Sequence, residues 1–324
     1  MSINDVNKKF WKEKKVLLTG GSGFLGKNLL PRLNELIEEI FVPRSSEFDL
    51  RKEKHIDALF NKFKPDIVIH LAADVGGIGY LMSNSGKIYF NNIMMNTLLI
   101  EKAMRYKVDK FVGINTVNCY PENAEIPTKE SYLWGGKPEK NVASYSMAKR
   151  MMIFQSEVYS EQYGFNSINL ILDNIYGPFD NFDLNTSRVI PALIRKCINA
   201  IENDEKEIIC WGDGSPKREF LYVEDAAEGI LLATEKYNKT DPINLGAGFE
   251  ISIKDIVKLI INLTGFEGDI IWDTSKPNGQ SRRCLDVSRA KKEFGFEAKI
   301  PLEEGLKKTI TWYKQNNKFK VNNG

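Results

Sequence analysis

Short apolar runs alternate with longer stretches of mixed polarity over the first half of the chain. The apolar runs have the length of buried strands, and the stretches between them repeat their apolar residues with the spacing of amphipathic helices. Predicted strands cover residues 14–20, 39–44, 66–73, 110–116 and 167–177, and predicted helices cover residues 24–36, 51–63, 89–107 and 143–164. Because these strands are apolar along most of their length, we expect a parallel sheet that helices cover on both faces.

After Pro178 the pattern becomes irregular, and loops rich in Asn, Asp, Gly and Pro separate shorter elements. Such a change indicates a second, smaller unit. We therefore predict an α/β fold in which a Rossmann-type, doubly wound parallel sheet (residues 1–172) is followed by a smaller α+β substrate-binding domain (residues 173–324). A segment near residues 218–248 is expected to return to the first sheet.

Composition narrows the possible partners. The chain has 324 residues, a formal charge of +2 and 42% hydrophobic residues, which are ordinary values for a globular protein. The near-neutral balance gives no global attraction to nucleic acid or to an anionic membrane. No signal peptide and no apolar run of membrane length is recognised. The four cysteines form no CxxC pair, which favours reduced thiols in a cytoplasmic protein, and no metal site is predicted.

A glycine-rich loop separates the first predicted strand from the first helix. The stretch "TGGSGFLG" places Gly20, Gly23 and Gly26 at this turn. Glycine permits a tight turn and lets the backbone approach a pyrophosphate, and the helix N-terminus offers N–H groups to the same anion. This context predicts a dinucleotide site that includes Gly20, Gly23, Phe24, Leu25 and Gly26.

The end of the second predicted strand indicates which dinucleotide binds. A site that prefers NAD usually has a carboxylate here for the ribose 2′-hydroxyl. This chain instead has Arg44, followed by two serines. A cation and hydroxyl groups suit a 2′-phosphate, so we predict NADPH as the cofactor. The alternative is an arginine that is simply solvated beside a loop.

Tyr145 and Lys149 are four residues apart on a predicted helix and therefore share one face. A free tyrosine has a pKa near ~10, and a nearby ammonium group stabilises the phenolate and lowers that pKa. Tyr145 could then exchange a proton with a sugar oxygen. Such a pair arises often by chance, but here it follows a glycine-rich loop and a fourth strand that ends in Thr116.

These motifs resemble the extended short-chain dehydrogenase/reductase family. The resemblance rests on TGGSGFLG (19–26), HLAA (70–73), Thr116 and YSMAK (145–149). It implies that Tyr145 is the acid/base, that Lys149 lowers its pKa and holds the nicotinamide ribose, and that Thr116 orients the substrate oxygen. The further cofactor contacts that it implies are Leu71, Ala72, Ala73, Asn115, Asn174 and Ile175.

Longer motifs are similar to the GDP-L-fucose synthases over nearly the whole chain. They include "AADVGGIGY", "NIYGPFDNF", "SRVIPALIRK", "WGDGSPKREFLYVED" and "SKPNGQSRR". That family epimerises a GDP-4-keto-6-deoxymannose at C3 and C5 and then reduces C4 with NADPH. The substrate contacts that the resemblance implies are Val75, Gly76, Asn118, Asn174, Arg188, Lys196, Trp211, Arg218 and Arg282. Among them, Lys196 and Arg218 can neutralise a diphosphate, and Trp211 can stack on a base or a sugar.

The two positions that epimerisation needs carry unexpected residues. Epimerisation beside a ketone requires one group that removes a proton and another that returns it from the opposite face. The resemblance places a cysteine and a histidine where this chain has Asn118 and Arg188. An amide does not titrate and arginine stays protonated, so neither can shuttle a proton. Cys119 would face away on an extended segment, and His70 is interpreted as a hydrogen-bonded structural residue.

The sequence thus predicts an NADPH-dependent C4 reductase of a GDP-linked 4-keto sugar, either a 6-deoxyhexose or a heptose, without 3,5-epimerase activity. It would act in nucleotide-sugar biosynthesis for surface glycans. The alternatives are a bifunctional GDP-L-fucose synthase and a catalytically inactive NADP-binding regulator. A 4,6-dehydratase would need an Asp–Glu pair directly after Thr116, where Val117 and Asn118 stand. Related enzymes pair through the helix that carries Tyr145 and the long helix before it, so a homodimer is predicted.

Overall fold

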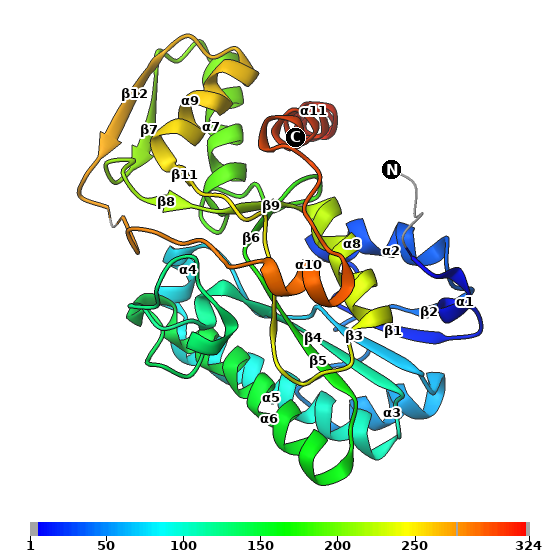
Figure 1. The fold of residues 1–324 in the computed structure, drawn as a ribbon. Coiled ribbons are helices and arrows are strands. Elements are labelled where there is room, and N and C mark those ends of the chain that lie inside the picture. The colour runs from blue at the N-terminus through cyan, green and yellow to red at the C-terminus, as the bar shows by residue number, and fades with distance from the viewer. Residues whose placement is uncertain (1–5, 277, 322–324) are drawn as a thin grey trace.

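A parallel sheet forms the centre of the larger part of the molecule (Figure 1). The computed structural model describes residues 6–276 and 278–321. Within these residues, six strands lie in the order β10-β5-β4-β3-β1-β2, and every neighbouring pair is parallel. Their bounds are β1 Lys15–Thr19, β2 Glu39–Phe41, β3 Ile67–His70, β4 Lys110–Thr116, β5 Ser167–Leu172 and β10 Ile243–Leu245. The predicted doubly wound α/β fold is confirmed.

Helices cover both faces of this sheet (Figure 1). One layer contains α1 (Lys8–Trp11), α2 (Phe24–Asn34), α8 (Val223–Lys236) and α10 (Ser288–Phe294), and the other contains α3 (Glu53–Phe63), α5 (Ser85–Arg105) and α6 (Ala143–Tyr163). Val16 and Leu18 of β1 pack into the first layer, whereas Leu17 packs into the second. Because side chains alternate along a strand, burial on both faces requires the continuous apolar runs of the sequence.

The second part of the molecule has its own hydrophobic core, built by short strands and three helices. Its elements are β6 (Asn174–Tyr176) paired with β9 (Phe220–Tyr222), β7 (Glu207–Trp211) with β12 (Asp269–Asp273), β8 (Lys217–Arg218) with β11 (Ile251–Ser252), and the helices α7 (Val189–Glu202), α9 (Ile253–Thr264) and α11 (Leu302–Val321). Strand β10 and helix α8 belong to the large sheet and its helical layer, and both fall in the segment near residues 218–248 where a return was predicted. Helix α10 also packs on the large sheet, although it lies outside that segment. The domain boundaries stay a prediction.

Short helices lie in the connections from β3 to α5 and from β4 to α6. They are α4 (Ile78–Ser83) and the 3₁₀ turns η1 (Val117–Cys119), η2 (Glu130–Tyr132) and η3 (Lys140–Val142). The strand predicted over residues 167–177 is interrupted at Asp173, whose carboxylate accepts the Asn174 N–H at 2.5 Å. The chain leaves the large sheet at Asp173 and continues in β6. The polar residues Asp173 and Asn174, inside an otherwise apolar run, mark this change from one sheet to the other. Similarly, β2 ends at Phe41, before Pro43.

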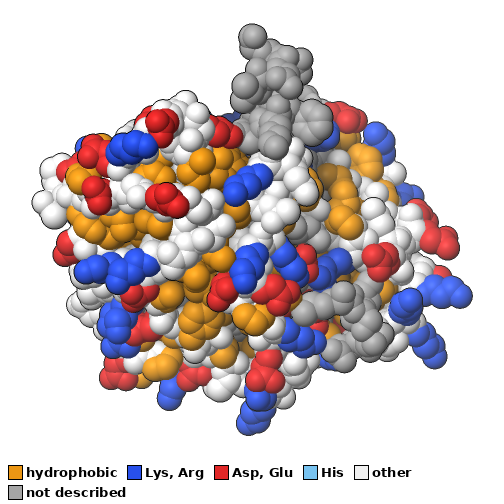
Figure 2. Space-filling view, turned by 90° about the horizontal axis from the view of Figure 1, so that it is seen from above, with side chains coloured by type: hydrophobic (Ala, Val, Ile, Leu, Met, Phe, Trp, Pro, Cys, Tyr) orange, Lys and Arg blue, Asp and Glu red, His pale blue; other side chains and the backbone are white. Residues whose placement is uncertain are grey.

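Surface charge is mixed on the face that Figure 2 presents. Lys and Arg side chains lie among Asp and Glu side chains, with hydrophobic side chains between them. That face therefore carries no extended field of one sign. Across the described part of the chain, no helix combines the length and the apolar character that crossing a bilayer requires.

Candidate active site

The glycine-rich loop lies at the carboxyl ends of β1 and β3, where the strand order reverses. Gly20 has a φ of +70°, and a Cβ at this residue would lie 2.6 Å from the backbone nitrogen of Ala72. A Cβ on Gly26 would lie 2.4 Å from the Cα of Gly21. Gly23 caps α2 without a side chain, which leaves the helix N-terminus open to an anion. This cradle fits a dinucleotide pyrophosphate at the switch point of the sheet.

Arg44 is exposed in the loop after β2, beside Ser45 and Ser46. Its carbonyl accepts the N–H groups of Glu47 and Phe48 at 3.0 and 2.8 Å, which forms a turn. Within residues 6–276 and 278–321, no carboxylate forms an ion pair with the Arg44 guanidinium. A cation without a protein partner next to two hydroxyl groups fits a phosphate group.

Thr116, Tyr145 and Lys149 come from two packed elements. Thr116 ends β4, and its hydroxyl accepts the N–H of Asn118 at 3.3 Å. Tyr145 and Lys149 lie on α6 and are buried, with 7% and 1% of their surface exposed. The Lys149 ammonium donates a hydrogen bond of 2.8 Å to the carbonyl of Ile114 in β4. The strand end and the helix face are thereby fixed relative to each other.

Burial dominates the electrostatics of this group. Burial raises the pKa of Tyr145 above its ordinary value, the Cys119 thiol raises it further, and the Arg188 cation lowers it. Burial lowers the pKa of Lys149 to about 8. The sequence predicted that Lys149 would lower the pKa of Tyr145. Desolvation is the largest influence on Tyr145 here, and the lowering of its pKa by Lys149 stays a prediction.

His70 has a structural role, as its place in the sequence suggested. Its ring nitrogens lie 2.7 Å from the Thr19 hydroxyl and 3.0 Å from the Asn96 amide oxygen. The Asn96 amide in turn donates to the carbonyl of Ala148, on α6, at 3.1 Å. Burial, together with the positive charge of Lys149, lowers the pKa of His70 to about 3. A neutral histidine therefore links β1 to the helix that carries Tyr145.

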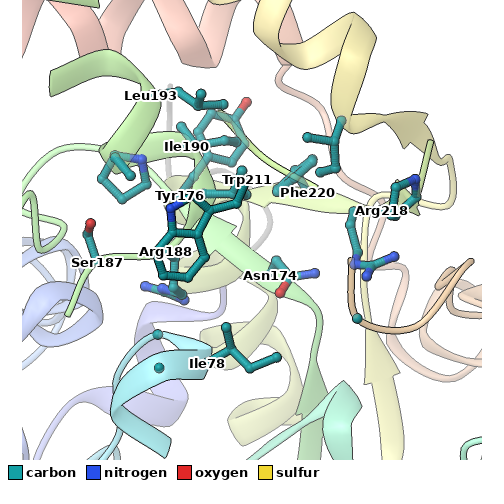
Figure 3. Close-up of a pocket in the computed structure, with 18 of the residues that line it drawn as sticks. Ile78, Asn174, Tyr176, Ser187, Arg188, Ile190, Leu193, Trp211, Arg218 and Phe220 are labelled. Carbon is teal, nitrogen blue, oxygen red and sulfur yellow. The ribbon is translucent and has the colours of Figure 1, made fainter. Parts of the chain in front are cut away.

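A cavity of about 360 Å³ opens between the large sheet and the smaller part (Figure 3). The predicted site residues that line it are Gly76, Asn118, Asn174, Ile175, Arg188, Lys196, Trp211 and Arg218. Thr116, Tyr145 and Lys149 are not among its lining residues, but Tyr145 packs with Leu81 and Val142, which do line it. Val75 is 51% exposed and does not line the cavity.

Arg282 does not reach this cavity, and its neighbour Arg283 does. The Arg282 guanidinium forms an ion pair with Glu250 at 2.8 Å. Arg283 donates to the amide oxygen of Asn118 at 2.6 Å and to Gln280 at 3.0 Å. The prediction from the motif "SKPNGQSRR" named Arg282, and the structure places the next residue, Arg283, at the cavity instead. Residue 277 of this motif lies outside the described residues.

Asn118 and Cys119 lie on the 3₁₀ turn η1 and not on an extended segment, so the alternation argument does not apply to them. The outcome for Cys119 is nevertheless the one expected. Cys119 is fully buried, its thiol donates to the carbonyl of Ser146 at 3.5 Å, and it does not line the cavity. Burial raises the pKa of this thiol to about 11. Asn118 faces the cavity in its place.

Basic side chains concentrate along the cavity. Lys196 donates to the carbonyl of Ile209 at 2.6 Å, and Arg218 donates to the carbonyl of Lys217 at 2.8 Å. Burial, with the nearby Arg283 cation, lowers the pKa of Arg218 to about 10, so it stays charged at neutral pH. Trp211 is half exposed at the cavity. Several cations beside an aromatic ring suit a diphosphate that carries a base.

Similarity to known proteins agrees with this geometry. Residues 16–246 match the NAD dependent epimerase/dehydratase family. The chain is 35% identical to the GDP-L-fucose synthase of Sinorhizobium fredii, over 94% of this chain and 96% of the relative. It is 34% identical to the GDP-L-colitose synthase of Yersinia pseudotuberculosis, over 92% of this chain and 97% of the relative.

Solved structures agree as well. A GDP-6-OMe-4-keto-L-xylo-heptose reductase from C. jejuni has a TM-score of 0.88 at 28% identity, over 94% of this chain and 98% of that one. MlghC, a GDP-mannoheptose C4 reductase from Campylobacter jejuni with NADP bound, has a TM-score of 0.85 at 29% identity, over 93% and 98%. A GDP-L-fucose synthetase from Naegleria fowleri bound to NADP has a TM-score of 0.87 at 28% identity, over 95% and 96%. The chain therefore belongs to the NAD dependent epimerase/dehydratase family, among the extended short-chain dehydrogenase/reductases of the GDP-L-fucose synthase subfamily.

Proposed function

We propose that this protein is an NADPH-dependent reductase of the C4 carbonyl in a GDP-linked 4-keto sugar, and that it does not epimerise C3 or C5. One observation carries the proposal. Lys149 bonds to β4 two residues before Thr116, and Tyr145 of the same helix packs against side chains that line the cavity, whereas the two epimerisation positions hold Asn118 and Arg188. Asn118 is bonded to Arg283, and Arg188 is paired with Asp180 at 3.0 Å. Neither can take and return a proton.

The cofactor class predicted from the sequence, NADP(H), is confirmed by the structural relatives that carry it. The glycine-rich loop would hold the pyrophosphate, and Arg44 the 2′-phosphate. Lys149 would hold the nicotinamide ribose, with Asn174 and Ile175 at the nicotinamide end. When bound, the cofactor supplies the hydride that C4 receives.

The proton comes from Tyr145 in this proposal. Thr116 holds the C4 oxygen by a hydrogen bond, and Tyr145 protonates this oxygen as negative charge develops on it. Because burial raises its pKa, Tyr145 is fully protonated at neutral pH and ready to act as an acid. The pKa of Lys149 is lowered to about 8. In this proposal Lys149 stabilises the ionised form of Tyr145 from the same face of α6.

The cavity would hold the rest of the substrate. Arg218, Arg283 and Lys196 lie where they could neutralise the diphosphate, and Trp211 could stack on the guanine base. The sugar is a 6-deoxyhexose or a heptose, since the relatives include enzymes named for both. A bifunctional GDP-L-fucose synthase is the second candidate, and the identity of about a third to proteins of that name favours it.

Proton exchange during turnover tests this function. The protein is given NADPH and GDP-4-keto-6-deoxymannose in D2O, with a 4-keto heptose analogue in parallel, and the sugar products are analysed by NMR. We expect NADPH consumption without solvent deuterium at C3 or C5. The variant Tyr145→Phe serves as the control for turnover. Deuterium at either carbon would support the bifunctional enzyme, and no consumption of NADPH with any 4-keto sugar would refute the reductase.

A homodimer is part of the proposal and rests on an apolar surface. Tyr89 and Phe90 of α5, Phe154 of α6 and the neighbouring Trp134 are between 43% and 57% exposed. Three exposed large apolar side chains on the packed helices α5 and α6, with Trp134 against Phe154, are typical of a contact surface between subunits. Light scattering after gel filtration should give twice the chain mass for the natural protein. Phe154→Glu should give the monomer, whereas an unchanged mass would place the contact elsewhere.

A further inference from the structure

Arg283 reaches the turn η1 from a segment that lies 165 residues further along the chain. Its Nε and Nη2 donate to the amide oxygen of Gln280 at 3.3 and 3.0 Å. Nη2 also lies 3.8 Å from the Glu139 carboxylate, and only 12% of each of these two charged side chains is exposed. A guanidinium that is enclosed and bonded on several sides in this way keeps one position.

The Asn118 amide meets the remaining nitrogen of this guanidinium. Nη1 of Arg283 donates to Oδ1 of Asn118 at 2.6 Å. Because a guanidinium has donors only, the amide atom that faces it must be the oxygen, and the amide nitrogen must point elsewhere. In the described part of the chain (residues 6–276 and 278–321), no acceptor takes the N–H groups of that nitrogen. Asn118 therefore carries an oriented donor that the protein itself leaves unused.

Two spaces border Asn118. One is the cavity of about 360 Å³ that is assigned to the substrate. The other, of about 10 Å³, lies toward Tyr120 and Pro121 and has room for no more than a water molecule. A substrate oxygen that meets the Asn118 donor must therefore do so in the larger cavity.

The position of Asn118 limits which oxygen it can reach. Its backbone N–H donates to the Thr116 hydroxyl at 3.3 Å, and Thr116 would hold the C4 oxygen of the sugar. An amide on the same turn then lies near the carbons next to C4, which carry the C3 hydroxyl on one side and the ring oxygen on the other. The hydroxyl is the better acceptor, because the ring oxygen shares its electrons with the anomeric carbon.

We propose that Asn118 is a specificity-determining residue whose amide nitrogen donates a hydrogen bond to the C3 hydroxyl of the 4-keto sugar, and that Arg283 is the positioning residue that orients this amide. The inference rests on the proposed reductase function and narrows its substrate class to sugars that keep the C3 hydroxyl, in preference to 3-deoxy sugars. The charge of Arg283 also attracts the diphosphate, which is a separate contribution.

Two substrates that differ only in this hydroxyl test the role of Asn118. They are GDP-4-keto-6-deoxymannose and its 3-deoxy analogue, with a GDP-4-keto heptose and its 3-deoxy analogue in parallel, and kcat/KM is measured at saturating NADPH. The two ketones of a pair differ in reactivity by themselves, so the informative quantity is the change of their kcat/KM ratio on substitution. We expect Asn118→Ala to reduce the preference for the hydroxylated sugar about three- to tenfold, as the loss of one hydrogen bond would. An unchanged ratio would overturn the inference.

Arg283→Met tests the orientation, because it removes the donors and keeps a long side chain. We expect kcat/KM to fall for both substrates, since the charge is lost, and the preference to fall as in Asn118→Ala, since the amide can turn. The matched control Lys196→Met removes another cation of the cavity, which is bonded to the carbonyl of Ile209. It should lower kcat/KM for both substrates and leave their ratio unchanged.

NADPH binding and the melting temperature show whether each variant is folded. If Arg283→Met does not fold, Gln280→Ala gives the same comparison, because it removes the acceptor that holds two nitrogens of Arg283. A preference that survives in the folded variant would show that Arg283 supplies charge alone, and would overturn its positioning role. A natural protein that consumes NADPH with no 4-keto sugar would refute the reductase itself, which is a different result.

Discussion

The cofactor half and the substrate half of the site are built in different ways. The glycine-rich loop joins β1 to α2 within a few residues, and the Thr116–Tyr145–Lys149 group comes from one strand and the helix packed on it. The cavity, in contrast, gathers side chains from segments as far apart as Gly76 and Arg283. The cofactor half therefore depends mainly on backbone geometry, and the substrate half depends on contacts between distant side chains.

This contrast predicts which substitutions should affect only the cofactor half of the site and which only the substrate half. Backbone geometry tolerates almost no added atoms, since a Cβ on Gly26 would approach the Cα of Gly21 to 2.4 Å. Side-chain contacts such as Asn118–Arg283 can be removed without moving the backbone. The substitutions below test the contrast, beginning with the largest expected effect.

Removal of the acid should affect chemistry and spare cofactor binding. Tyr145→Phe keeps the packing against Leu81 and Val142 and removes the phenolic proton. We expect kcat to fall about 10²- to 10⁴-fold, while the Kd of NADPH from fluorescence titration stays within about twofold of its original value, since the glycine-rich loop is untouched. A comparable loss of NADPH affinity would show that the two halves are not separable in this way.

The adjacent arginines offer a matched pair for the substrate half. Arg283→Gln removes a buried charge that donates to Asn118 at 2.6 Å, and we expect KM to rise about 10- to 100-fold. Arg282→Gln breaks only an exposed ion pair with Glu250 and should change KM less than about threefold. Steady-state kinetics at saturating NADPH measure both. Equal effects would contradict the assignment of Arg283 to the cavity wall.

Two alanine substitutions test the cofactor loop. Gly26→Ala forces the backbone of Gly20 and Gly21 to move, and we expect NADPH to bind about tenfold more weakly, as overpacking costs on the order of 1–3 kcal/mol. The control Gly86→Ala lies in α5 with nothing within 4 Å of the added Cβ. It should leave NADPH affinity unchanged and raise the melting temperature slightly, because alanine favours helix. A loss of affinity in this control would point to an indirect effect.

Alkylation of thiols distinguishes positions 118 and 119 of η1, and of these tests it should disturb the protein least. The pKa of Cys119, raised to about 11, leaves on the order of one thiolate in a thousand at pH 8. Iodoacetamide should therefore leave Cys119 unmodified in the folded protein, as mass spectrometry of peptides would show. In Asn118→Cys the new thiol faces the cavity and should be modified readily. Rapid modification of Cys119 would reopen its role in epimerisation.

The sequence predicted the cofactor half from local signals. The spacing of Gly20, Gly23 and Gly26 and the pair Tyr145–Lys149 depend on local rules of strands, turns and helices. Seven of the nine substrate residues that the long motifs implied line the cavity; Val75 and Arg282 do not. The sequence did not identify Arg283 or find that β6 separates from β5 at Asp173, because both depend on neighbours that are distant in the chain.

The sequence by itself determined the doubly wound sheet, the dinucleotide loop and the chemistry available at residues 118 and 188. Periodicity and glycine spacing are local, and the kind of side chain at a position does not change on folding. Only the tertiary structure decided that Asn118 holds Arg283 and that Arg188 is fixed by Asp180. It also decided the direction of the Tyr145 pKa, because burial and the charges around a group are properties of the packed chain.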